Sequence, residues 1–210
     1  MMFIMSAFQT GNVQAAGAPW VGTTLWGTPC TGAGEGYGPF DYLLRSQYSK
    51  ELILVESAHF TPNVENLISG STGSLTADLG YTLRAWPNHH RALNSVVRLR
   101  VRMGSNFPRS GDPPAECYLQ RAINYSRKDS TAQMLYAMLL HRMSQNEKAL
   151  QYYQAAENLS PNDVQIKYNM GLLLCDMGRY QEAKSLANEV YAQGYPLPGL
   201  RRRLSAKGYD

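Results

Sequence analysis

The stretch that decides the fold is STAQMLYAMLLHRMSQNEKALQYYQAAENLSP at residues 130–161, followed by VQIKYNMGLLLCDMGRYQEAKSLANEVYAQGY at residues 164–195. A shift of 34 residues brings similar side chains of the two stretches together: Tyr136, Ala137 and Leu140 superpose on Met170, Gly171 and Leu174, and Ala149 on Ala183. A fixed period of this length predicts stacked helical hairpins. The small residues let two helices approach closely, and the large ones fill the space between hairpins.

The period and these positions resemble the tetratricopeptide repeat, with residues 130–161 as one repeat and residues 164–195 as another. In the first repeat, Tyr136 and Ala137 stand at the Leu-Gly pair of the family, and Pro161 closes the repeat. The resemblance implies a pair of antiparallel helices in each stretch.

Two features depart from the family pattern. The Trp expected three residues before the Leu-Gly pair is Gln133 in the first repeat and Lys167 in the second. The closing proline of the second repeat is displaced to Pro196. Neither change breaks a helix pair.

A third, less regular repeat lies upstream. Small and large residues at 115, 119 and 122 repeat the spacing of those at 149, 153 and 156, which predicts a second helix over about 114–126. Its first helix is then HRALNSVVRLRVRM at 90–103, with an inter-helix loop about six residues longer than usual. VVRLRVRM also alternates like a strand. The repeat frame favours a helix, and it places Arg100 where an apolar residue is expected.

These patterns predict an all-α fold, a tetratricopeptide-repeat α-hairpin solenoid of about three hairpins at residues 74–196. A capping helix and tail follow at 197–210, and an irregular Gly/Pro-rich arm precedes the array at 16–73. SLTADLGYTLRAW supplies one more helix, paired with TPNVENLIS. Within the arm, the apolar run Leu52 to Val55 predicts one short strand or helix.

Composition excludes several classes of protein. Charged residues make up 17% of the 210 and hydrophobic residues 44%, which excludes a highly charged disordered chain. A net charge of +4 falls short of the basic surface of a dedicated nucleic-acid binder. No membrane span is expected. Residues 1–15 resemble the remnant of a signal peptide, although no Lys or Arg precedes Arg45. This predicts a periplasmic or secreted protein, with a cytoplasmic one as the alternative.

The three cysteines leave at least one thiol unpaired. Cys30 lies in the arm and Cys117 at a predicted helix start, so the favoured pairing after export is Cys30 with Cys117. That disulfide would fasten the arm to the helical array. The alternative is three unpaired thiols that pack as small apolar residues.

No constellation of residues indicates catalysis, a metal or a cofactor. The run GAGEGYG has no preceding strand and no following Gly-Lys-Ser/Thr, so it does not indicate a nucleotide loop. The histidines show no metal-ligand spacing. The alternative is a site in the arm formed by His59 with Glu56 and Glu65. The sequence therefore predicts a protein that is not an enzyme, with no catalytic residues, metal site or cofactor.

The family resemblance implies a concave groove lined by the first helix of each hairpin. The expected groove residues are Arg91, Asn94, Arg98, Arg102, Met134, Met138, Arg142, Tyr168, Asn169 and Leu172, together with Cys175. Arginine, asparagine and methionine there suit an acidic or C-terminal peptide of a protein partner.

Two alternatives to an open groove remain at this stage. The arginines pair with acids of the same chain, or the arm fills the groove. Docking of the arm on a neighbouring array would instead make a self-assembling homo-oligomer.

Overall fold

The computed structural model describes residues 17–104 and 111–209, so the expected signal-peptide remnant lies outside the described residues. Within these ranges the regular elements are helical, apart from an isolated bridge between Thr23 and Pro29. A short 3-10 helix, η1 (Tyr42–Leu44), precedes the α-helices. These are α1 (Ser49–His59), α2 (Pro62–Glu65), α3 (Leu75–Ala85), α4 (His90–Met103), α5 (Ala115–Tyr125), α6 (Ser130–Arg142), α7 (Asn146–Leu159), α8 (Val164–Asp176), α9 (Tyr180–Ala192) and α10 (Gly199–Ser205). None of these helices is long and apolar enough to cross a membrane.

Equivalent residues cap the first helix of each hairpin. Asp129 before α6 and Asp163 before α8 each accept a hydrogen bond from the backbone N–H three residues later, at 3.1 and 3.3 Å. They are 34 residues apart. His89 caps α4 in the same way, because its Nδ1 accepts the N–H of Ala92 at 3.1 Å. His89 precedes Asp129 by 40 residues, six more than the period, as the sequence predicted.

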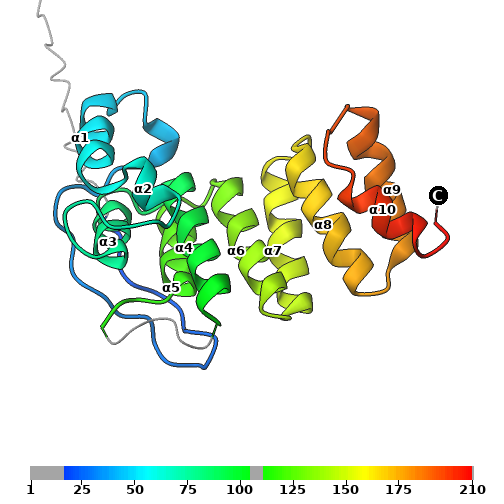
Figure 1. Cartoon of the computed structure of the whole chain (residues 1–210), viewed down its shortest axis with the longest axis horizontal. Helices are drawn as coiled ribbons and strands as arrows, with labels where there is room; N and C mark the ends of the chain where they lie inside the picture. Colours follow the sequence, from blue (N-terminus) through cyan, green and yellow to red (C-terminus); the bar gives the residue numbers. More distant parts are fainter. Residues whose placement is uncertain (1–16, 105–110, 210) are drawn as a thin grey trace, which may run out of the picture.

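The hairpins stack along the long axis of the molecule (Figure 1). α4 pairs with α5, α6 with α7 and α8 with α9, while α6 packs on both α4 and α5. The small residues permit the predicted close approach: Ala137 is fully buried, and a Cβ added to Gly171 would lie 2.6 Å from Leu200. VVRLRVRM lies inside α4. The predicted all-α repeat array is therefore confirmed.

A capping helix closes the C-terminal end. α10 packs on α8 and α9 through Leu200 and Leu204, which are both buried. The three arginines between them are exposed. An apolar inner face and a charged outer face are what the end of a repeat array requires.

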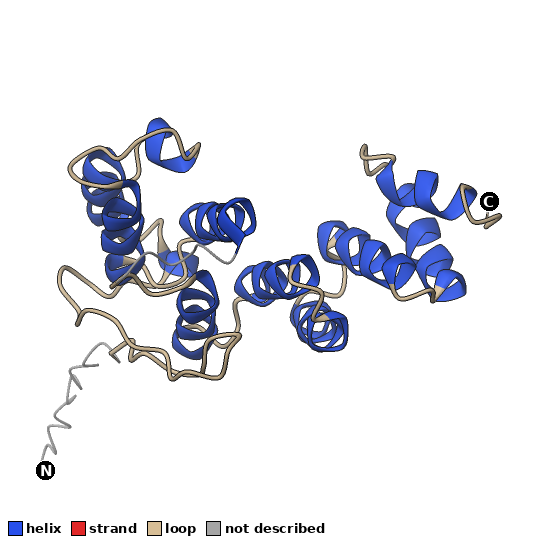
Figure 2. Cartoon of the chain, turned by 60° about the horizontal axis from the view of Figure 1, so that its bottom comes forward, coloured by secondary structure: helices blue, strands red, loops and turns tan. Residues whose placement is uncertain are grey.

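The part of the chain before residue 74 holds more helix than the sequence indicated. Leu52 to Val55 lies in α1, which is eleven residues long and packs on α3. α2 packs on α3 and α4 through Val64, which is fully buried. Residues 17–41 are irregular, and this loop runs beside the helices at the N-terminal end (Figure 2).

The carboxylate of Asp78 closes the turn that leads into α3. It is almost fully buried and accepts hydrogen bonds from the N–H groups of Ser71 and Thr72 at 2.6 and 3.1 Å, and from the Thr72 hydroxyl at 2.6 Å. Nδ1 of His59 lies 2.9 Å away. Burial raises the pKa of Asp78, but these hydrogen bonds outweigh burial and hold the pKa far below its usual value.

We expect acid to destabilise the fold partly through Asp78. Because its pKa is lower in the folded chain than in the unfolded chain, its contribution is complete above the unfolded pKa of about 3.9 and is lost as the pH falls further. Urea unfolding between pH 7 and pH 3 measures the loss. The variant Asp78→Asn cannot titrate, so it should be less stable at pH 7 and lose less stability on acidification. Equal acid losses in the two proteins would contradict this role.

Candidate functional site

The arginines of α4 are bound by the segment around α2. The Nε of Arg91 donates to the Glu65 carboxylate at 2.8 Å, and a second guanidinium nitrogen completes a bidentate pair. Arg98 donates to the backbone carbonyl of Glu65, and Arg102 donates to the carbonyl of Leu67 at 3.2 Å. Arg91 also reaches Glu56 of α1 at 3.3 Å. This arrangement matches the alternatives in which the chain's own acids and arm occupy the arginines.

The segment that binds these arginines belongs to the core. Phe60, Val64 and Leu67 are buried together with residues of α3 and α4. The hydrogen bond from Arg91 holds the pKa of Glu65 below its ordinary value, although burial opposes the shift. Asn94, which lies between the arginines on α4, is half-buried. The α4 end of the expected groove is therefore filled by the chain itself.

Two further expected groove residues point into the core. Met134 on α6 and Tyr168 on α8 are buried. The ring of Tyr168 lies 4.7 Å from that of Tyr195, and the amide of Asn169 contacts the Met134 sulfur at 3.8 Å. Cys175 is also buried and has a free thiol. These side chains shape the hairpin interface and do not form an open surface.

The remaining four expected residues converge on one pocket of about 320 Å³. Met138 and Arg142 come from α6, and Asn169 and Leu172 come from α8. The walls are completed by side chains that sequence reasoning did not assign to a site: His141 of α6, Asp176 of α8, Tyr153 of α7 and Arg203 of α10. We call this pocket the Arg142 pocket.

Charges at the Arg142 pocket leave one arginine unpaired. Asp176 accepts hydrogen bonds from His141 at 2.8 Å and from Arg203. Burial raises the pKa of Asp176, but the bonds from Arg203 and His141 outweigh it, so the pKa lies below its ordinary value. Arg142 is exposed and makes no ion pair or hydrogen bond with the described residues. A carboxylate that enters this pocket would meet Arg142.

Arg203 reaches the Arg142 pocket from the capping helix α10. It lies three residues after the buried Leu200, so it shares the side of α10 that faces the array. That spacing is the signal that would have placed Arg203 at the pocket.

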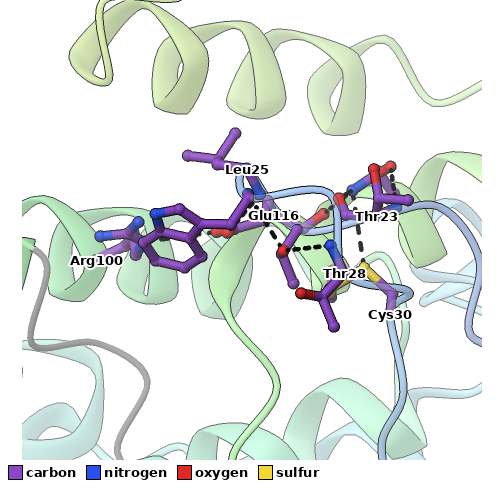
Figure 3. The surroundings of a disulfide bond; sticks show 10 residues. Thr23, Leu25, Thr28, Cys30, Arg100 and Glu116 are labelled. Atoms are coloured by element: carbon purple, nitrogen blue, oxygen red, sulfur yellow. Dashed lines mark hydrogen bonds and ion pairs between the residues drawn. A yellow bond between two sulfur atoms is a disulfide. The ribbon is translucent and has the colours of Figure 1, made fainter.

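The arm is fastened to α5. Cys30 and Cys117 form a disulfide with Cα atoms 5.4 Å apart (Figure 3). Near the bond, the N–H of Leu25 donates to Glu116 at 3.2 Å. Glu116 is fully buried and forms an ion pair with Arg100 at 3.5 Å. This pairing explains how α4 holds a charged residue at a position where the repeat predicts an apolar one.

The histidines are held by partners of the chain. His59 contacts Asp78 and not Glu56 or Glu65, so the alternative site of these three residues does not form. Nε2 of the buried His89 lies 2.9 Å from Glu56, and because Nδ1 accepts a backbone N–H, Nε2 is the donor. Among the residues described, no group of three or more His, Cys, Asp and Glu is placed to hold a metal ion.

Comparison with known proteins supports the repeat fold of the array. Residues 113–190 match the family model described as anaphase-promoting complex, cyclosome, subunit 3. A tetratricopeptide repeat protein from Parabacteroides merdae superposes with a TM-score of 0.52 and 17% identity, over 73% of this chain and 57% of that one. This chain has the fold of a tetratricopeptide-repeat array. Two crystal structures titled MamA share the fold, with TM-scores of 0.54 and 0.50, identities of 13% and 15%, and coverage of 77% and 65% of this chain and 85% and 78% of theirs.

One curated relative is similar to the tetratricopeptide-repeat array in sequence. Human protein O-mannosyl-transferase TMTC1 is 29% identical over 118 residues, which make up 56% of this chain. The match spans 13% of that protein's length. A transferase activity is therefore not carried over to this chain. Arrays of this family present extended surfaces that bind other proteins, and the fold suggests a protein-protein interaction scaffold.

Proposed function

We propose that this protein is a non-enzymatic scaffold that binds a partner through the Arg142 pocket, and that it recognises an acidic side chain or a C-terminal carboxylate. The observation that carries the proposal is the unpaired, exposed Arg142 beside Met138, Asn169 and Leu172. A guanidinium binds a carboxylate through two parallel hydrogen bonds. The Asn169 amide suits the peptide backbone, and the two apolar side chains suit a neighbouring residue of the peptide.

The other charged residues of the expected groove support a binding site that is limited to the Arg142 pocket. The arginines of α4 are already bound by Glu56, Glu65 and the carbonyl of Leu67, so they do not compete for a peptide. Asp176 forms an ion pair with Arg203 and a hydrogen bond with His141, which limits repulsion of an incoming acid. A short peptide segment is therefore the ligand that fits this end of the array.

Peptide binding tests the proposal directly. Short random peptides with a free C-terminal carboxylate are screened against the immobilised protein, and those retained are measured by fluorescence anisotropy. Arg142→Glu should weaken binding at least about tenfold, because it replaces a charge-assisted bond by repulsion. Arg202→Glu, an exposed arginine of α10 outside the pocket, is the matched control and should bind as wild type does.

Amidated peptides distinguish a C-terminal carboxylate from an acidic side chain as the group that is bound. Loss of binding on amidation identifies the C-terminal carboxylate, and retained binding identifies an acidic side chain. Equal affinity of Arg142→Glu and wild type for every retained peptide would overturn the proposal.

We further infer a periplasmic or secreted location, since disulfides persist in oxidising compartments. The alternative of a self-assembling subunit, with the arm on a neighbouring array, receives less support. The arm is attached to its own array by the Cys30–Cys117 bond and by the bonds of Arg121 and Gln120. Light scattering over a range of concentrations would distinguish a monomer from such an assembly.

A further inference from the structure

A second pocket, of about 420 Å³, lies where the arm meets the array and shares no lining residue with the Arg142 pocket. Gly22 comes from the arm, Ile123 from α5, Arg127 from the turn after α5, Gln133 from α6 and Tyr152 from α7. Its volume falls within the roughly 300–1,000 Å³ of ligand sites in proteins. We call it the Gln133 pocket.

The origin of this pocket is the residue at position 133. Gln133 stands where the repeat pattern has a tryptophan, so the space of an indole ring is not filled from within the hairpin. The equivalent residue of the next repeat, Lys167, extends to an ion pair with Glu189 of α9. The first repeat has no such replacement, and its pocket remains open to solvent.

The Gln133 side chain has a hydrogen-bond acceptor without a donor among the described residues. Its Oε1 atom is buried and has no donor among the described residues. A buried acceptor left without a partner is costly, so a donor supplied by a ligand at the pocket wall is favoured. Rotation of the Gln133 amide toward the pocket would present this acceptor to a ligand N–H.

The other walls suit a flat aromatic group. The Tyr152 ring is held in an edge-to-face contact with Tyr136, with centroids 4.5 Å apart, and Ile123 adds apolar surface. Arg127 is exposed and makes no ion pair with the described residues, so its guanidinium is free to stack on a ring. The arm wall is fixed, because Gln120 bonds both the N–H and the carbonyl of Thr23, at 3.2 and 2.7 Å.

We propose that the Gln133 pocket binds a tryptophan side chain of a partner protein. Indole is the side-chain group that combines a large flat ring with a single N–H donor and no acceptor. It would occupy the space that the repeat normally fills with its own tryptophan, donate to Gln133 and stack under Arg127. Tryptophan is also among the residues that dominate binding energy at protein interfaces. This site is a second docking point, independent of the Arg142 pocket.

The test uses N-acetyltryptophanamide as the probe and the ¹⁵N-labelled full chain. Titration should shift the side-chain amide signal of Gln133 and the backbone signal of Gly22, and leave signals around Lys167 unchanged. The 1-methylindole analogue, which lacks the N–H, should bind about tenfold more weakly, the factor expected for one hydrogen bond. N-acetylphenylalaninamide should also bind more weakly.

Two variants make the result specific. Gln133→Trp restores the family residue, should fold with at least the thermal stability of wild type, and should lose probe binding at least tenfold. Arg127→Ala changes an exposed side chain and should weaken binding severalfold, whereas Arg142→Glu should not affect it. Equal binding by Gln133→Trp and wild type, or by the methylated and unmethylated probes, would overturn the proposal. If the probe does not bind but the protein dimerises, and Trp26→Ala abolishes the dimer, the occupant is a second copy and the proposal of a separate partner fails.

Discussion

Replacement of both Cys30 and Cys117 by alanine is expected to lower the free energy of unfolding by about 2–5 kcal/mol. The two cysteines are 87 residues apart, so the bond restricts a long loop of the unfolded chain. Long loops lose the most conformational freedom on cross-linking. In the folded chain the bond also holds the irregular arm on α5, where it covers Glu116. Urea unfolding of the two proteins measures the difference.

The control for this experiment is Cys175→Ala. Cys175 is the buried free thiol, so its replacement removes a small apolar side chain without removing a bridge. Its loss should amount to about 1 kcal/mol. Dithiothreitol should bring wild type close to the double variant and leave the double variant itself unchanged. If thiol titration of the denatured, unreduced wild type finds three free thiols, the disulfide is absent and the prediction fails.

The array could be predicted from the sequence because its contacts are local and periodic. The helix caps Asp129 and Asp163 repeat at the same interval as the small residues Ala137 and Gly171. Each repeat forms most of its contacts with its neighbours, so a one-dimensional pattern contains most of the information about the fold. The position of α10 could also be predicted, because two of its leucines lie four residues apart.

The filled groove at α4 could not be predicted in the same way. Arg91 meets Glu65 from 26 residues away, and Arg102 meets the carbonyl of Leu67 from 35 residues away. Neither pairing follows a period. The period of the sequence indicates that these arginines share one side of α4, but it does not predict the path of the arm that covers them.

The full length of α1 could not be predicted from the sequence, for a related reason. Ile53 and Leu54 are exposed and Val55 is its one buried residue, so the helix lacks the apolar stripe that marks helices packed on a core. Its position depends on the packing of Val55 in a small cluster with Trp86 and on polar contacts, such as that of Glu56 with His89. Four of the expected groove residues line the Arg142 pocket, and Arg203 joins them from α10.

Arg121 on α5 is a second anchor of the arm, and its removal is expected to cost about 3 kcal/mol, the sum of two hydrogen bonds from a charged donor. Its side chain is fully buried. Nε donates to the carbonyl of Ala18 in the arm at 2.6 Å, and Nη1 donates to the carbonyl of Leu83 in α3 at 2.7 Å. The residue four positions after Leu83 is Pro87, which has no N–H for that carbonyl. Arg121 thus completes a helix end that the proline leaves open.

The change Arg121→Met tests this role, because it keeps an apolar stem of similar length and leaves both carbonyls without a donor. Burial lowers the pKa of the Arg121 guanidinium, which indicates that the charge is held in the core at a cost that the two carbonyls and the ring of Trp20, 5.0 Å away, offset. Arg121→Lys keeps the charge but cannot span both acceptors, so its loss should be intermediate. Arg127→Met, at an exposed position in the turn after the same helix, should change stability by less than about 0.5 kcal/mol. A loss for Arg121→Met as small as that of the control would show that water replaces the guanidinium at both carbonyls, and that the disulfide alone holds the arm.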